Sequence, residues 1–238
     1  MIRTSLLALF FISAVILGLP WLVLWTILTG NPDLMWATAM KAVRFGNRLA
    51  GIRVRTEGLE NIPAQPCVFI ANHASNVDPL VFIPAIPRRV GILVKRELFR
   101  IPIFSAAMMR ARFTPVDRGD RESSGKSISA AAQILKEGLS YAIFAEGTRS
   151  PDGRLRPFKK GGFTMAIEAG APIVPVSIAG TQRLLQKGGW IIAPGEANVT
   201  FGPAVDASKY TPENRAELIQ RIESLVASGL PTGQQPLH

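Results

Sequence analysis

The chain has 238 residues, enough for one large domain or two small ones, and 47% of them are apolar while 18% are charged. Its formal net charge of +10 favours a polyanionic partner, either an anionic membrane surface or a phosphorylated substrate. We expect no nucleic-acid partner, because the sequence has no zinc-ligand spacing, recognition-helix signature or basic–aromatic RNA motif.

The chain has one cysteine, Cys67, so an intramolecular disulfide is impossible. Its apolar neighbours disfavour a reactive thiolate, and we expect it to pack as a small hydrophobic residue. One internal histidine, one cysteine and scattered carboxylates do not form a ligand cluster. We therefore expect neither a metal centre nor a cofactor.

An apolar stretch begins the chain. No charged residue occurs between Arg3 and Asp33, and most of this segment is Leu, Ile, Val, Phe or Trp. About twenty such residues are enough for a helix to cross a bilayer. Gly18 and Pro20 interrupt the stretch, so a kinked or re-entrant hairpin in one leaflet is an alternative to a full crossing. A cleaved signal peptide fits less well, because the stretch is too long and no small-x-small cleavage site follows.

Residues 34–49 mix cationic and apolar side chains at helical spacing. This pattern is typical of a helix that lies among lipid headgroups, and an ordinary helix packed against the core is the alternative. The distribution of Lys and Arg favours a cytoplasmic position for the rest of the chain. We therefore expect a membrane-associated protein, in a bacterial inner membrane with its active site on the cytoplasmic face.

A polar connection follows the apolar strand predicted at residues 67–71 and precedes a helix that begins near Pro79. It carries His73 and Asp78, and a strand-to-helix connection at the end of a sheet strand is a usual place for a functional site. The other histidine, His238, is the last residue, so His73 is the candidate for proton transfer near neutral pH. The alternative is a polar loop histidine beside an aspartate that caps the helix.

Strand-like and helix-like segments alternate through the rest of the chain, which predicts an α/β fold with a largely parallel or mixed central sheet flanked by helices. We assign residues 1–50 to the membrane anchor and its amphipathic helix, 51–228 to the α/β domain and 229–238 to a disordered tail. Helices are predicted at 127–137, at 163–169 and from residue 211. The predicted strands are 68–71, 91–95, 112–116, 141–145, 173–178, 190–193 and 198–201.

A second polar cluster, Glu146-Gly147-Thr148-Arg149, directly follows the predicted strand 141–145. Further cations come soon after it, and a pair of glycines precedes the next predicted helix. Basic side chains and backbone N–H groups at a helix N-terminus can hold an anion together. The cations of this segment are Arg149, Arg154, Arg156, Lys159 and Lys160.

Four blocks in this order resemble the glycerophospholipid acyltransferase family and, within it, the 1-acyl-glycerol-3-phosphate acyltransferases. Ala145 stands where the family usually has proline, which affects the rigidity of the turn more than its chemistry. The resemblance extends over roughly residues 68–178. The blocks are Asn72-His73 with Asp78, residues 113–118 ending in Asp117-Arg118, residues 144–150, and Val174-Pro175-Val176.

This resemblance implies transfer of a fatty acyl group from a thioester of coenzyme A or acyl carrier protein to the sn-2 hydroxyl of lysophosphatidate, giving phosphatidate. His73 would be the general base, and Asp78 would orient its ring and stabilise the imidazolium. No protein nucleophile is required, because the substrate supplies the hydroxyl. The resemblance places Arg118, Glu146, Gly147, Thr148 and Arg149 at the acceptor, with Arg149 as the first choice for its phosphate and Lys95 and Lys159 as further cations.

Three alternatives remain open at this point. The same fold could acylate another lyso-lipid, such as lyso-ornithine lipid or another lysophospholipid. A membrane-anchored module could bind anionic lipid without catalysis, and a thioesterase could transfer the acyl group to water. The partners we expect are membrane lipids and the acyl donor, and the sequence leaves the oligomeric state open.

Overall fold

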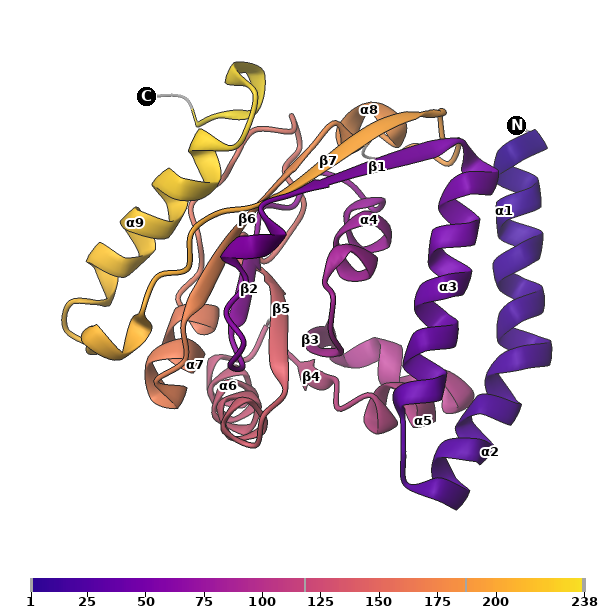
Figure 1. Ribbon diagram of the computed structural model, residues 1–238, viewed down its shortest axis with the longest axis horizontal. Coiled ribbons are helices and arrows are strands. Elements are labelled where there is room, and N and C mark those ends of the chain that lie inside the picture. Colours follow the sequence, from indigo (N-terminus) through magenta and orange to yellow (C-terminus); the bar gives the residue numbers. More distant parts are fainter. Residues whose placement is uncertain (1, 118, 187, 237–238) are drawn as a thin grey trace.

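The computed structural model describes residues 2–117, 119–186 and 188–236 (Figure 1). The strands are β1 (Ile52–Glu57), β2 (Val68–Ala71), β3 (Val90–Lys95), β4 (Thr114–Val116), β5 (Ser140–Phe144), β6 (Ile173–Ala179) and β7 (Gly195–Phe201). Over the described residues these strands form one sheet in the order β1-β7-β6-β2-β5-β3-β4. Neighbouring strands are parallel except for β6 and β7, so the predicted mixed α/β sheet is confirmed.

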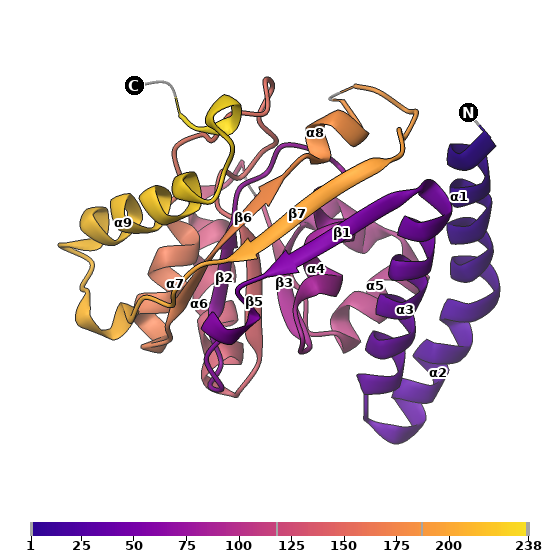
Figure 2. The same ribbon diagram turned by 45° about the horizontal axis from the view of Figure 1, so that its top comes forward.

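The N-terminal segment is a helical hairpin at one edge of the molecule (Figures 1 and 2). Its first arm runs through α1 (Ile2–Ser13), a π-helical turn at Ala14–Gly18 and α2 (Leu19–Thr29), and α3 (Asp33–Ala50) returns beside it. The backbone N–H of Leu19 donates to the carbonyl of Ala14, so the chain passes the Gly18-Leu19-Pro20 segment through a wider turn instead of a break. The first arm is the one helix of the described chain that is long and apolar enough to cross a membrane.

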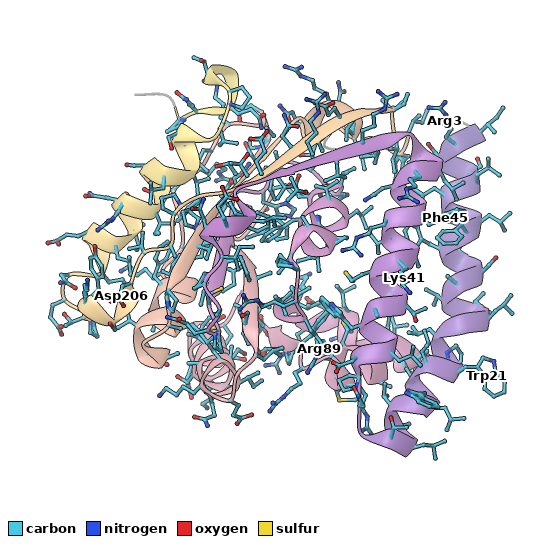
Figure 3. All side chains as sticks on the ribbon, in the orientation of Figure 1. Arg3, Trp21, Lys41, Phe45, Arg89 and Asp206 are labelled. Atoms are coloured by element: carbon cyan, nitrogen blue, oxygen red, sulfur yellow. The ribbon has the colours of Figure 1, made fainter. Side chains whose placement is uncertain are left out.

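Apolar side chains cover the outer side of the first arm. Trp21 is 72% exposed and points away from the body of the protein (Figure 3). Such a surface is costly in water and suits a lipid environment. On the inner side, α3 buries Met35, Asn47 and Ala50. The helix therefore also packs as a core helix, as the alternative interpretation of residues 34–49 expected. The other exposed apolar side chains of the first arm are Ile2, Leu6, Leu9, Ile12, Ile16, Leu17, Leu24, Trp25, Ile27 and Leu28.

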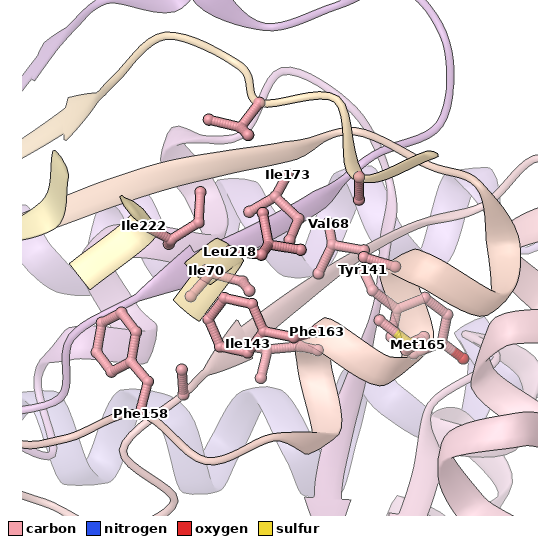
Figure 4. Close-up of a cluster of buried hydrophobic side chains, with 14 of the residues drawn as sticks. Val68, Ile70, Tyr141, Ile143, Phe158, Phe163, Met165, Ile173, Leu218 and Ile222 are labelled. Atoms are coloured by element: carbon pink, nitrogen blue, oxygen red, sulfur yellow. The ribbon is translucent and has the colours of Figure 1, made fainter. Parts of the chain in front are cut away.

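Helices cover both faces of the sheet. On one face, α6 (Arg121–Lys136), α7 (Gly161–Ala169) and α9 (Arg215–Ser228) enclose a core built on β2, β5 and β6 (Figure 4). On the other face, α3 and α4 (Asp78–Ala85) pack against a core that includes side chains of β1, β2, β6 and β7. The remaining elements are α5 (Pro102–Arg110), α8 (Thr181–Leu184) and the 3₁₀ turns η2 (Leu59–Asn61), η3 (Arg96–Arg100), η4 (Ala207–Lys209) and η5 (Thr232–Gln234).

One predicted strand was wrong, and one strand of the sheet was not predicted. Residues 190–193 form a loop, in which Trp190 is 89% exposed and the N–H of Ala193 donates to the carbonyl of Leu184. This run of apolar residues has no strand beside it, so it has no ladder to join. The missed strand is β1, whose alternating residues Arg53 and Arg55 give its sequence a polar character. Ile52, its first residue, is buried. Alternation with one polar face is what a half-exposed strand requires.

Residues 229–236 pack against the rest of the domain, so the disorder predicted for them is wrong. Leu230 and Gln234 are buried, and the carbonyl of Gln234 accepts a hydrogen bond from the N–H of Leu155 at 2.8 Å. The composition of this segment is polar. Its amide groups nevertheless find buried partners, which only the folded chain provides.

Candidate active site

The register of the sheet brings the two polar clusters together. Ala71, at the end of β2, lies opposite Phe144 at the end of β5 and Val176 on β6. Because β2 and β5 are parallel and end at the same level, the residues that follow them leave the same edge of the sheet. His73 and Glu146 are therefore neighbours, although 73 positions separate them in the sequence.

His73 and Asp78 form a hydrogen-bonded pair. The distance from His73 Nδ1 to Asp78 Oδ2 is 2.8 Å, and the Asp78 side chain is fully buried while that of His73 is 17% exposed. The same Oδ2 accepts the N–H groups of Ala74 at 2.7 Å and Ser75 at 2.8 Å. Three donors thus hold Asp78 as a carboxylate acceptor. A bond from Nδ1–H to the carboxylate leaves Nε2 as the ring nitrogen that can accept a proton.

Phe144 defines the plane of the imidazole. The two ring centroids are 4.2 Å apart and the planes differ by 24°, so the rings are stacked. Phe82 of α4 contacts Phe144 edge-on, with 5.6 Å between the centroids. With Asp78 at one nitrogen and Phe144 on one face, the imidazole has little freedom to rotate. We did not predict Phe144, although an aromatic residue directly before the 145–149 turn was a usable signal.

Glu146 supports the backbone of His73. Its Oε1 accepts the His73 N–H at 2.7 Å, and the His73 carbonyl accepts the N–H of Ser150 at 2.8 Å. Glu146 is 4% exposed, and its Oε2 has no hydrogen-bond partner among the described residues. Burial raises the pKa of this carboxyl from 4.5 to about 7, and the negative charge of Asp78 adds to the effect. Glu146 therefore holds the backbone of the His73 loop in place through this hydrogen bond.

We expect Glu146→Gln to reduce the loss of stability on going from acidic to alkaline pH. In the wild type the unfolded carboxyl ionises near pH 4.5 while the folded one keeps its proton until about pH 7, so the free energy of unfolding falls through this interval. The difference between the two pKa values corresponds to a loss of about 3 kcal/mol in the free energy of unfolding. Gln keeps an oxygen for the His73 N–H and removes the ionisation. Denaturant unfolding at about pH 5 and about pH 8 measures the change in the free energy of unfolding for each protein. An identical pH dependence in both proteins would contradict the assignment.

Arg149 and its neighbours form the turn that follows Glu146. Gly147 has a φ of +72°, and a Cβ at this position would lie 2.7 Å from Lys159 Cδ, so the Lys159 side chain covers the glycine. The N–H of Lys159 also donates to the carbonyl of Ala145 at 2.8 Å. Thr148 is exposed and Arg149 is half-buried on the same turn. The structure thus groups Gly147, Thr148, Arg149 and Lys159 beside His73 and Asp78.

An apolar cavity of about 210 Å³ adjoins this turn. Gly147 and Lys159 belong to its wall together with Phe144, the residue stacked on His73. The rest of the lining comes from β3, β4, β5 and the helices α6 and α7. Its main apolar members are Ile92, Leu93, Val116, Ile128, Ala142 and Ile143.

The predicted cation Lys95 does not line the cavity. Lys95 ends β3 with its side chain 60% exposed, pairs with Glu97 at 2.9 Å and is not among the residues that line the cavity. Arg118 lies outside the described residues.

Asn72 has a structural role that the motif did not reveal. Its side-chain amide exchanges two hydrogen bonds with the backbone of Ile178, at 2.9 and 2.7 Å, and so ties the end of β2 to β6.

The acyltransferase family model matches residues 53–179, which include the His73–Asp78 pair and the 146–149 turn. The chain belongs to this acyltransferase family. It is 36% identical over 180 residues to a 1-acyl-sn-glycerol-3-phosphate acyltransferase of Pseudomonas aeruginosa, a match that covers 75% of this chain and 69% of that protein. An enzyme of the same name from Borreliella burgdorferi is 32% identical over 186 residues, which is 74% of each chain.

A solved structure is similar along nearly the whole chain of this acyltransferase. The crystal structure of the 1-acyl-sn-glycerophosphate (LPA) acyltransferase PlsC from Thermotoga maritima superposes with a TM-score of 0.78 and 28% sequence identity. The match covers 96% of this chain and 95% of that one, so it includes the N-terminal hairpin. The family and fold that the four sequence blocks indicated are therefore confirmed.

Proposed function

We propose that this acyltransferase is a 1-acyl-sn-glycerol-3-phosphate acyltransferase, which acylates the sn-2 hydroxyl of lysophosphatidate and so produces phosphatidate for phospholipid biosynthesis. Relatives of this name in two bacteria support the activity. The observation that carries the mechanism is the 2.8 Å contact between His73 Nδ1 and Asp78 Oδ2, because it prepares Nε2 as a base beside a basic turn. We infer that the enzyme works at the cytoplasmic face of a bacterial inner membrane.

In this proposal, His73 Nε2 removes the proton of the sn-2 hydroxyl while the hydroxyl oxygen attacks the thioester carbonyl. Asp78 stabilises the imidazolium that forms, and Phe144 keeps the ring in its plane. A new C–O bond forms and the carbonyl becomes a tetrahedral oxyanion. When the oxyanion collapses, the C–S bond breaks and the imidazolium returns its proton to the leaving thiolate. The base ends in its starting state, and the products are phosphatidate and a free thiol.

The acceptor phosphate requires cationic partners near this base. Arg149 lies on the turn held against the His73 backbone, and it forms no ion pair with another described residue. A guanidinium can donate two parallel N–H bonds to a phosphate. We assign Arg149 to the phosphate and Lys159 to a supporting position, while the hydroxyl of Thr148 offers a further donor. The apolar cavity beside Gly147 offers room for an acyl chain.

An acceptor panel tests the proposed activity. The purified protein is mixed with an acyl-coenzyme A or an acyl carrier protein thioester, and thiol release is followed with lysophosphatidate, with lyso-ornithine lipid, with other lysophospholipids and without acceptor. We expect release that depends on lysophosphatidate. Equal release without acceptor would indicate a thioesterase, and a preference for another lyso-lipid would change the acceptor while keeping the mechanism. The two donors in parallel identify the carrier.

We expect Arg149→Gln to raise the KM for lysophosphatidate about 10- to 100-fold, the effect of losing a hydrogen bond between charged groups. The kcat should change less, because the base and its partner are untouched. A monoacylglycerol, which has no phosphate, is the diagnostic acceptor, since its slow acylation should not respond to this change. Arg215→Gln on α9 is the matched control. An unchanged KM in Arg149→Gln would remove this residue from the phosphate site.

A further inference from the structure

Three arginines from separate segments border a hollow at the open end of the hairpin. They are Arg3 of α1, Arg48 of α3 and Arg53 of β1, and the hollow measures about 590 Å³. Figure 3 labels Arg3 at this end of the hairpin. The rest of the lining consists of Gly51, Ile52, Pro194, Gly195 and Glu196.

The charge in this hollow is unbalanced. Its one carboxylate, on Glu196, already binds Arg55 Nε at 2.8 Å. The side chains of Arg3, Arg48 and Arg53 form no hydrogen bond or ion pair with any other residue that the structure describes. The Arg3 guanidinium lies over Gly51, where a Cβ would come within 2.6 Å of its Nη1. Three arginines on the wall of one hollow, with no counter-charge on their side chains, favour an anion, and the paired donors of a guanidinium suit the oxygens of a phosphate.

Exposed apolar side chains lie on the loop that leads to Pro194 and Gly195 of this hollow. In the loop between α8 and β7, Trp190 is 89% exposed and Ile191 is 57% exposed. The next residue fastens this loop to α1, because the N–H of Ile192 donates to Thr4 Oγ1 at 3.1 Å. Exposed Trp190 and Ile191 therefore lie close to the start of α1, where the exposed apolar surface of the hairpin begins. An exposed tryptophan beside cations is typical of the headgroup level of a bilayer.

We propose that this corner is a second membrane-binding site, in which Arg3, Arg48 and Arg53 hold phosphate headgroups of anionic phospholipids while Trp190 and Ile191 insert beside them. A free phosphate ion would satisfy the arginines and leave the exposed apolar pair unexplained. A bilayer surface satisfies both, and it is continuous with the apolar side of α1. The occupant we assign is therefore anionic lipid in a bilayer.

The inserted loop is also connected to the active site. Ser75 Oγ donates a hydrogen bond to the carbonyl of Leu185 at 2.8 Å, and Ser75 lies two positions after His73. Insertion of Trp190 would thus hold the His73 loop near the depth of the headgroups. This consequence, unlike the binding site itself, rests on the proposed function, because it matters for an acceptor that lies in the membrane.

Vesicle binding of the full-length protein tests the arginine site without any turnover. We expect the triple variant Arg3→Gln, Arg48→Gln, Arg53→Gln to bind phosphatidylglycerol vesicles about 100-fold more weakly than the wild type, and to bind phosphatidylcholine vesicles about equally well. The control variant Lys136→Gln, Lys209→Gln, Arg221→Gln removes the same charge from exposed positions elsewhere and should bind normally. Equal weakening in both variants would overturn the proposal, since net charge alone would then explain the binding. Unchanged binding in the first variant would overturn it too.

A single fluorophore tests the insertion. Cys67 is fully buried, and burial raises the pKa of its thiol to about 11, so a thiol-reactive dye labels only an introduced cysteine. We expect the emission from dye on Ile191→Cys to shift to shorter wavelength on vesicles and to be quenched by lipids brominated in their acyl chains. Dye on Ser208→Cys, at the far side of the sheet, should show neither effect. An unquenched dye at position 191 in vesicle-bound protein would overturn the insertion, and melting curves for each variant confirm its fold.

Discussion

Replacing His73 with alanine is expected to lower kcat for lysophosphatidate acylation by a factor of about 10²–10⁴, the usual contribution of a general base. The loss follows from the position of Nε2, the one ring nitrogen that Asp78 does not occupy. KM should change little, because Arg149 and the apolar cavity remain. The measurement is acceptor-dependent thiol release under saturating substrates.

The chain supplies a matched control for this experiment. His238 is the other histidine, and His238→Ala should retain full activity. The fold of His73→Ala should survive as well, since the backbone bonds of residue 73 to Glu146 and Ser150 do not use the imidazole. Denaturant unfolding of both variants checks this. Phosphatidate formation at the wild-type rate in a folded His73→Ala protein would contradict the proposed mechanism.

The second large effect is expected for Asp78→Asn, which should lower kcat by a factor of about 10³–10⁴, as loss of the carboxylate in a hydrolase triad does. The neutral amide cannot stabilise an imidazolium. Because one oxygen of Asp78 accepts from Ala74, Ser75 and His73 Nδ1, an amide oxygen in its place would keep all three bonds and lose only the negative charge, whereas an NH₂ group there would lose all three.

A readout other than rate separates this role from a merely structural one. If Asp78 acts through the imidazole, Asp78→Asn should change the pH dependence of kcat, whereas simple loosening of the loop would lower kcat at every pH. Asp206→Asn is the control, because Asp206 also accepts a backbone N–H at the start of a helical turn but lies at η4. Full activity in Asp78→Asn would show that the pair serves the fold alone.

Local sequence was sufficient for the parts of the molecule that are built locally. His73 and Asp78 lie five positions apart on one strand-to-helix connection, so the chain between them is too short to separate them far. The apolar N-terminal arm and most strands of the sheet are also local, because each depends on a run or period of side chains within one segment. These features, with the order of the four blocks, were enough to predict the family and the α/β fold.

The tertiary structure decided which distant residues meet. Glu146 reaches the His73 backbone, and Phe144 reaches its ring, because Ala71 and Phe144 pair in one register. A shift of the β2–β5 pairing by one residue would turn each side chain of the shifted strand to the opposite face of the sheet. The loop at 190–193 is exposed because no strand lies beside it, and Arg3 and Arg53 border one hollow because the hairpin returns to the edge of the sheet. Such contacts depend on packing between segments, which no single stretch of sequence contains.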